Sequence, residues 1–172
     1  MKLSRILPLL LLVVVASCSK NGNTELLDQA NRAYAAKNTA DAAKLYEQFL
    51  QESPDSPQAP KALYNLGSIY QMESKMAAKA LEMYDRIVTA FPKDSLAPKS
   101  LFVCGFLSAN VLNDTAKART YYDKYLAEYA AADTNITNSV RLELKNLGKT
   151  PEQVLEELQN TANASSANGH QD

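Results

Sequence analysis

The sequence has very few histidines and cysteines and no tryptophan. Its 172 residues include no Trp, two Cys and one His, and that His is His170, near the C-terminus. A Ser-His-Asp or Cys-His arrangement therefore has no base held beside its nucleophile. No Cys-x-x-Cys, His-Glu-x-x-His or calcium-loop spacing occurs, and neither does a glycine-rich phosphate loop. We expect a chain that is not an enzyme, has no catalytic residue and binds no metal or cofactor.

An excess of charge of either sign is also absent. Lys and Arg number 18 against 19 Asp and Glu, which removes the basic face that a nucleic-acid partner requires. No aromatic residue precedes Tyr34 or follows Tyr129. We therefore expect a single domain whose packed core lies between these two residues.

The N-terminus carries a short signal-like segment. Lys2 and Arg5 are followed by an uncharged run of eleven mostly Leu and Val residues, 6–16. A helix that crosses a bilayer needs about 20 apolar residues, so this run is too short to span a membrane. It suits the apolar region of an export signal.

The end of this segment, Val15-Ala16-Ser17-Cys18, resembles the lipobox of bacterial lipoproteins. In that family the signal is cut before the cysteine, which then carries acyl chains. The resemblance implies a lipoprotein signal peptide over residues 1–17, lipidation of Cys18, and a lipidated, flexible tether over residues 18–24. Several acyl chains together anchor a protein stably, because each buried methylene adds about 0.8 kcal/mol. The alternative is an ordinary signal peptide that ends by chance at a cysteine.

With Cys18 assigned to lipid, Cys104 is the only remaining cysteine, so an internal disulfide is impossible. Cys104 follows the apolar residues Leu101-Phe102-Val103. We interpret its side chain as a small buried hydrophobe rather than a nucleophile.

A repeat of 38 residues organises the middle of the chain. Aligning residues 58–92 with residues 96–130 gives 10 identities in 35 positions, well above the level of unrelated sequence. The residues that recur at this spacing are Tyr46, Tyr84 and Tyr122; Ala42, Ala80 and Ala118; Pro54 and Pro92; and Gly67 and Gly105.

Apolar residues at helical spacing predict two helices in each unit. Because proline cannot continue a helix, the second helices should end just before Pro54 and Pro92. We predict that Ser56 and Asp94 are the N-caps of the helices that follow. The proline of each Ala-Pro-Lys tripeptide falls in the first turn of these helices, where a missing N–H is tolerated.

Glycine inside a helix needs a reason, because it costs about 1 kcal/mol relative to alanine. For Gly67 and Gly105 we predict close approach of the paired helix through Ala80 and Ala118. The tyrosines one turn beyond these alanines should fill the space beside the next unit.

Together these residues resemble the tetratricopeptide repeat (TPR): Leu-Gly followed by Tyr in the first helix of a unit, then Ala, Tyr and Pro in the second. The family repeat usually spans about 34 residues, and here it is four longer. Ala30 stands in place of the first glycine, and Ser108 and Ala130 replace the third Tyr and Pro. The resemblance implies an all-α, helical-hairpin solenoid of about three TPR-like units over residues 25–130.

The C-terminal segment predicts two further helices. An apolar stripe covers one face of the first, and its residues are Ile136, Val140, Leu144 and Leu147. Thr150-Pro151-Glu152-Gln153 has the form of a capping box that opens a short helix to about Leu158. We expect residues 131–160 to form capping helices over the open end of the last repeat. Residues 161–172 are small and polar and predict a disordered tail.

In TPR proteins the first helices of the units line a concave groove that holds a partner's peptide or helix. Transferred to this chain, the resemblance implies eight groove candidates: Lys61, Tyr64, Ser68, Gln71, Lys99, Phe102, Phe106 and Asn110. The lysines suit an acidic segment and the rings an apolar floor. The alternative is that the lysines are ordinary surface residues and the rings belong to the core.

The combination of lipobox and repeats resembles two envelope lipoproteins, the TPR lipoprotein of the β-barrel assembly machine and the TPR coordinator of the Tol–Pal system. It implies a lipid-anchored scaffold or adaptor that binds other envelope proteins or peptides, in an outer-membrane assembly or Tol–Pal-type complex. A glycan- or peptidoglycan-binding lipoprotein without catalysis is the alternative. Ser19 is not the Asp that retains lipoproteins at the inner membrane, so we expect the outer membrane, with the domain facing the periplasm.

Overall fold

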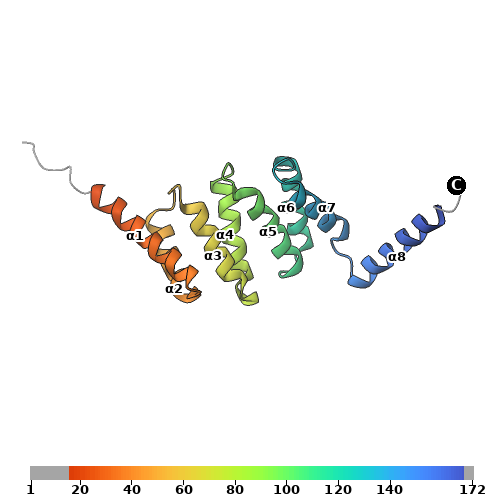
Figure 1. Cartoon of the computed structure of the whole chain (residues 1–172), viewed down its shortest axis with the longest axis horizontal. Coiled ribbons are helices and arrows are strands. Elements are labelled where there is room, and N and C mark those ends of the chain that lie inside the picture. Colours follow the sequence, from red (N-terminus) through yellow and green to blue (C-terminus); the bar gives the residue numbers. More distant parts are fainter. Residues whose placement is uncertain (1–15, 169–172) are drawn as a thin grey trace, which may run out of the picture. The chain divides into compact units, whose positions relative to one another are not determined.

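The computed structural model describes residues 16–168, with side chains over residues 23–73, 75–160 and 163. This range holds α-helices, one short 3-10 helix at Ser74–Met76 and no strand, which confirms the expected all-α class (Figure 1). The α-helices are α1 (Ala16–Ala35), α2 (Thr39–Glu52), α3 (Ala59–Gln71), α4 (Ala77–Ala90), α5 (Ala97–Asn110), α6 (Thr115–Glu128), α7 (Thr134–Asn146) and α8 (Pro151–Asn168).

The chain divides into two compact units, Met1–Ser56 and Pro57–Asp172. The first unit contains the hairpin of α1 and α2. The second contains the hairpins α3–α4 and α5–α6, with α4 packed against α5 and α7 packed against α6 and α5. No helix of the described range is long and apolar enough to cross a bilayer.

The first unit is held together around Tyr46, which is fully buried on α2. The Tyr46 hydroxyl donates to Asn31 Oδ1 on α1 over 2.8 Å, and its ring meets the Tyr34 ring edge-on at 6.3 Å. Ala30, which stands at the glycine position of the repeat, is also fully buried. This hairpin therefore accommodates a methyl group where the other two have glycine.

In the second unit the repeat glycines, Gly67 and Gly105, each face the tyrosine of their own hairpin. A Cβ added to Gly67 would lie 3.0 Å from Tyr84 Cζ, and one added to Gly105 would lie 2.6 Å from Tyr122 Cδ1. The predicted close approach of the paired helix is present, and the atoms nearest each glycine belong to the tyrosine ring of that helix. Tyr122 also packs in one core cluster with Val140 of α7, the helix that follows its hairpin.

The prolines mark the helix ends as predicted, but two predicted N-caps are wrong. α2 ends at Glu52 and α4 at Ala90, just before Pro54 and Pro92 as expected. The next helices begin at Ala59 and Ala97, and their cap residues make no side-chain capping bond. Ser56 therefore lies outside the helix, and Asp94 Oδ1 accepts from the amide of Leu96 in the preceding turn. A proline in the first turn of each helix removes one amide that a cap would satisfy.

The outermost helices are longer than expected. The α1 backbone is already helical at residues 18–24, the predicted tether, and α8 continues to Asn168 through most of the predicted tail. No proline interrupts α1, and none follows Pro151 in α8. The rest of the predicted signal peptide, residues 1–15, and residues 169–172 lie outside the described range.

Helix α7 covers the end of the last repeat, and α8 does not share in this cover. Fully buried Val140 belongs to the core cluster of Tyr122 and Tyr125, and the rest of the predicted stripe packs around it. α8 makes no extensive contact with another helix of the described range.

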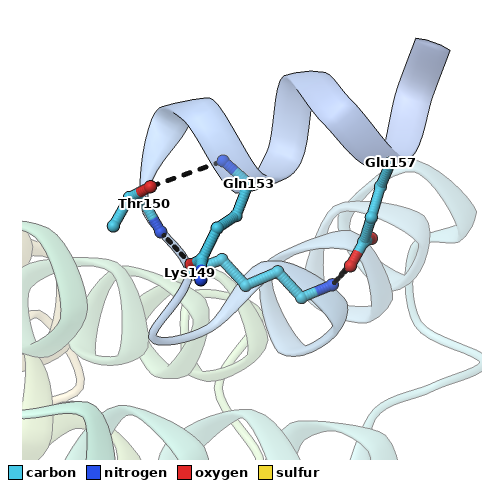
Figure 2. Close-up of polar contacts among 4 residues, drawn as sticks. All are labelled: Lys149, Thr150, Gln153 and Glu157. Atoms are coloured by element: carbon cyan, nitrogen blue, oxygen red, sulfur yellow. Dashed lines mark hydrogen bonds and ion pairs between the residues drawn. The ribbon is translucent and has the colours of Figure 1, made fainter. Parts of the chain in front are cut away.

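The start of α8 forms the predicted capping box. The Thr150 amide donates to Gln153 Oε1 over 2.8 Å, and the Gln153 amide donates to Thr150 Oγ1 over 3.4 Å (Figure 2). An ion pair from Lys149 Nζ to Glu157 Oε1 at 2.7 Å links the helix to the turn that precedes it.

Candidate functional site

The eight predicted groove residues lie four on α3 and four on α5, the first helices of the two hairpins of the second unit. Along α5, Lys99, Phe102, Phe106 and Asn110 recur at helical spacing and share one face. The repeat of 38 residues therefore places equivalent positions of both helices in the same region of the unit.

The lysine end of this region is formed by α3 and α5 together. Lys99 Nζ lies 5.2 Å from the centroid of the Tyr64 ring, where the negative face of the ring attracts a cation. The same ring meets Tyr84 edge-on, with centroids 5.4 Å apart. Tyr64 is half-buried and thus belongs to both the core and the surface. Lys61, on the first turn of α3, is exposed.

Further along α5 there is a groove of about 320 Å³. It is lined by Gln71, Phe102, Val103, Phe106, Ser139, Leu142 and Glu143. Phe106 is 37 % exposed and Leu142 is 59 % exposed. Two apolar side chains of this size, open to water in one groove, form a surface that a partner can cover with a gain in free energy.

Three of the residues that line this groove come from α7, and sequence reasoning missed them. The apolar stripe of α7 faces the core, whereas Ser139, Leu142 and Glu143 lie on a different face. Leu142 was the available signal, because it is a large apolar residue that does not fit the stripe.

The remaining candidates have other surroundings. Gln71 Oε1 accepts a hydrogen bond from the Tyr84 hydroxyl over 3.1 Å, so Gln71 lines the groove and also supports the hairpin. Asn110 donates to the backbone oxygen of Phe106 over 3.1 Å. It lines a second hollow of about 630 Å³ between the end of α5, α7 and α8. Ser68 is half-buried on α3.

Glu143 on α7 is the acidic residue of the groove lining, whereas Lys99 lies outside that lining, one turn before Phe102 on α5. Burial, and then the Glu143 carboxylate, raise the pKa of the Tyr122 hydroxyl. That hydroxyl is buried without a hydrogen bond of good geometry. Gln71 accepts the hydrogen bond of the Tyr84 hydroxyl. The equivalent position one repeat later is Ala109, whose side chain has no acceptor for the Tyr122 hydroxyl.

Cys104 is fully buried, and its Sγ lies 3.9 Å from the Leu81 backbone oxygen. Burial raises the pKa of the thiol, so it stays protonated at neutral pH. The interpretation of Cys104 as a buried hydrophobe is confirmed. Among the described side chains no group of three or more His, Cys, Asp or Glu residues is placed to hold a metal ion.

Comparison with known proteins agrees with the helical-repeat fold. Residues 27–95 match the model of the tetratricopeptide repeat family. The chain is similar to the solved N-terminal domain of stress-induced protein-1 (STI-1) from C. elegans, with a TM-score of 0.59 and 18 % identity over 73 % of this chain and 97 % of that domain. It is also similar to the Sgt2 TPR domain from Aspergillus fumigatus, with a TM-score of 0.52 and 22 % identity over 73 % and 80 % of the two chains. No curated protein sequence matches the chain.

Proposed function

We propose that this chain, a tetratricopeptide-repeat protein by its fold, is a lipid-anchored scaffold that binds other proteins of the bacterial cell envelope through the groove of α3, α5 and α7. The observation that carries the proposal is the exposure of Phe106 and Leu142 in one groove. Grooves of this kind take an extended or helical segment, whose apolar residues fill the floor while charges at the rim set its direction.

The charges at the two ends support a particular class of partner. Lys61 and Lys99 favour an acidic group at the start of α5, and Glu143 disfavours one at the other end. The partner that fits best is a segment whose apolar residues lie on one face, whose acidic residues lie near Lys61 and Lys99, and whose other end is uncharged beside Glu143.

The envelope location is supported by the sequence around Cys18. The lipobox-like residues Val15-Ala16-Ser17-Cys18 favour an acyl anchor, and Ser19 favours the outer membrane with the repeats facing the periplasm. Feeding cells a clickable fatty acid tests the anchor, and the label is expected on the native chain and absent from Cys18→Ser. A labelled Cys18→Ser variant, or an unlabelled native chain, would remove the anchor from the proposal.

The binding function is tested by affinity capture of the tagged chain from crosslinked cells, followed by mass spectrometry. We expect envelope proteins, of a barrel-assembly or Tol–Pal-type complex, that are lost from a Phe106→Glu, Leu142→Glu double variant. These two residues are better targets than Tyr64 and Phe102, whose half-buried rings also support the hairpins.

A matched control is Leu112→Glu, since Leu112 is also 37 % exposed but does not line the groove. Loss of the same proteins from this control would mean that added charge, rather than the groove, decides binding. Retention of every partner by the double variant would refute the groove as the binding surface. Retention of the chain on purified cell-wall sacculi, with no protein partner, would favour the glycan-binding alternative.

A further inference from the structure

Helix α8 has an apolar stripe that its own unit leaves largely uncovered. Leu155 and Leu158 are 56 % and 59 % exposed, and α8 makes no extensive contact with another described helix. Its attachment is polar, through the capping box and the Lys149–Glu157 ion pair (Figure 2). Helices in proteins gain most of their stability from packing of an apolar face, and this helix of 18 residues has little such packing. A surface that covers the two leucines would therefore stabilise α8.

Charge is distributed unevenly along α8. Glu152 and Glu156 are four residues apart, so they lie on the same side of the helix, next to Leu155. From Leu158 to Asn168 the sequence contains no charged residue. The helix thus has an acidic and apolar first half and an uncharged second half.

The groove has the complementary pattern. Lys61 and Lys99 provide positive charge near the starts of α3 and α5. Phe106 and Leu142 provide an exposed apolar floor further along, and Glu143 provides negative charge beside that floor. An acidic segment is favoured at the first end and an uncharged segment at the second.

We propose that α8 of one copy of this chain occupies the groove of a second copy. The inference rests on the proposed function, because it uses the same groove. The helix runs parallel to α5, with Glu152 near Lys99 and Leu155 against Phe102, which also lines the groove. Three residues separate Lys99 from Phe102, and the same spacing separates Glu152 from Leu155.

Docking between two copies is favoured over docking within one chain. The leucines of α8 lie in the hollow that Asn110 lines, at the C-terminal end of α5. Lys99 is at the other end of α5, about 16 Å away along the helix axis. The capping box and the Lys149–Glu157 pair fix the start of α8, near the C-terminal end of α5. Reciprocal exchange of α8 between two copies closes a symmetric dimer, and it makes α8 compete with any partner segment for the groove.

The test is a photo-crosslinking amino acid, benzoylphenylalanine, in place of Phe106 in the full chain in cells. We expect an adduct of twice the chain's mass whose crosslinked peptide contains residues 152–159. A Lys61→Glu, Lys99→Glu double variant should lower the yield of this adduct about tenfold, because two attractions become repulsions. Adding Glu152→Lys and Glu156→Lys to that variant should restore the yield.

The matched control for the charge reversal is Lys93→Glu with Lys117→Glu, two exposed lysines outside α3 and α5. This pair should leave the adduct unchanged, and circular dichroism should show the same helix content in all variants. An adduct within a single chain, a dimer adduct through another segment, or no rescue by the reversed charges would overturn the proposal. Crosslinks to other proteins without a dimer adduct would overturn the α8 proposal alone, whereas the absence of any adduct would count against both proposals.

Discussion

Gly105 and Tyr122 are in tighter contact than Gly67 and Tyr84, their equivalents one repeat earlier. A methyl group on Gly105 would lie 2.6 Å from Tyr122 Cδ1, whereas one on Gly67 would lie 3.0 Å from Tyr84 Cζ. Both tyrosines are buried, with Tyr122 fully so. The third hairpin of the repeat therefore has the least room at its glycine.

This difference predicts that the fold tolerates alanine at Gly67 but is destabilised by alanine at Gly105. Gly105→Ala should lower the free energy of unfolding by about 2 kcal/mol, because the fully buried Tyr122 ring must move. For Gly67→Ala a gain of about 1 kcal/mol in helix propensity offsets a milder clash, so little net change is expected. Urea unfolding of both variants, followed by circular dichroism, provides the comparison. Equal losses would show that the tyrosine contacts do not distinguish the hairpins.

The tyrosine hydroxyls should also differ in their contribution to stability. Tyr84→Phe removes the hydrogen bond to Gln71 and leaves the amide oxygen without its donor, so a loss of about 1 kcal/mol is expected. Tyr122→Phe removes a buried hydroxyl that has no hydrogen bond of good geometry, and it should cost clearly less. The measurement is the same urea titration, with both variants in one series. A larger loss for Tyr122→Phe would show that Glu143 accepts a strong hydrogen bond from it.

The fold should lose stability at alkaline pH. Burial raises the pKa of the Cys104 thiol above its ordinary value of 9.0 and that of the Tyr121 and Tyr122 hydroxyls above 10.0. The unfolded chain therefore releases these protons at lower pH than the folded chain does, and stability falls as pH rises past the ordinary values. Each group contributes up to about 1.4 kcal/mol per pH unit. Unfolding free energies measured from neutral pH to about pH 10.5 test this expectation.

Cys104→Ala provides the control for that pH dependence. It removes the group that titrates first, so the decline should begin at a higher pH and be shallower. An unchanged profile would mean that the tyrosines alone account for it.

The capping box of α8 predicts a local effect without a global one. Thr150→Ala should destabilise α8 by about 1 kcal/mol, the usual contribution of a side-chain cap. Hydrogen exchange of the α8 amides should become faster while the unfolding midpoint of the other helices stays the same, because α8 has no extensive packing with them. A lower midpoint for the whole chain would show that α8 supports the repeats.

The hairpins could be predicted from the sequence because the repeat of 38 residues carries the same contacts from unit to unit. Pro54 and Pro92 marked two helix ends correctly, since the absence of an N–H acts locally. The predicted caps at Ser56 and Asp94 failed because the chain makes a turn before each helix begins. Propensity does not locate a helix start to within a few residues.

The groove was only partly predictable. The repeat indicated Phe102, Phe106 and Gln71, which do lie together, but Asn110 lines the hollow beside α8 instead. The contribution of α7 follows from how it packs on α5 and α6, and such a long-range contact leaves no periodic signal in a single sequence. The roles of the groove residues in binding remain predictions.

Helix α7 packs against the core with one set of residues and lines the groove with another, whereas the repeat helices combine these two roles. Val140 and its neighbours on one face hold the helix to the core, and Ser139, Leu142 and Glu143 on another face line the groove. Substitutions at Ser139 and Leu142 would change the lining of the groove while leaving the buried contacts of Val140 intact, whereas Glu143 also acts on the buried Tyr122 hydroxyl. The lining of the groove can therefore diverge through one helix outside the repeats, without any change in the repeating framework that supports it.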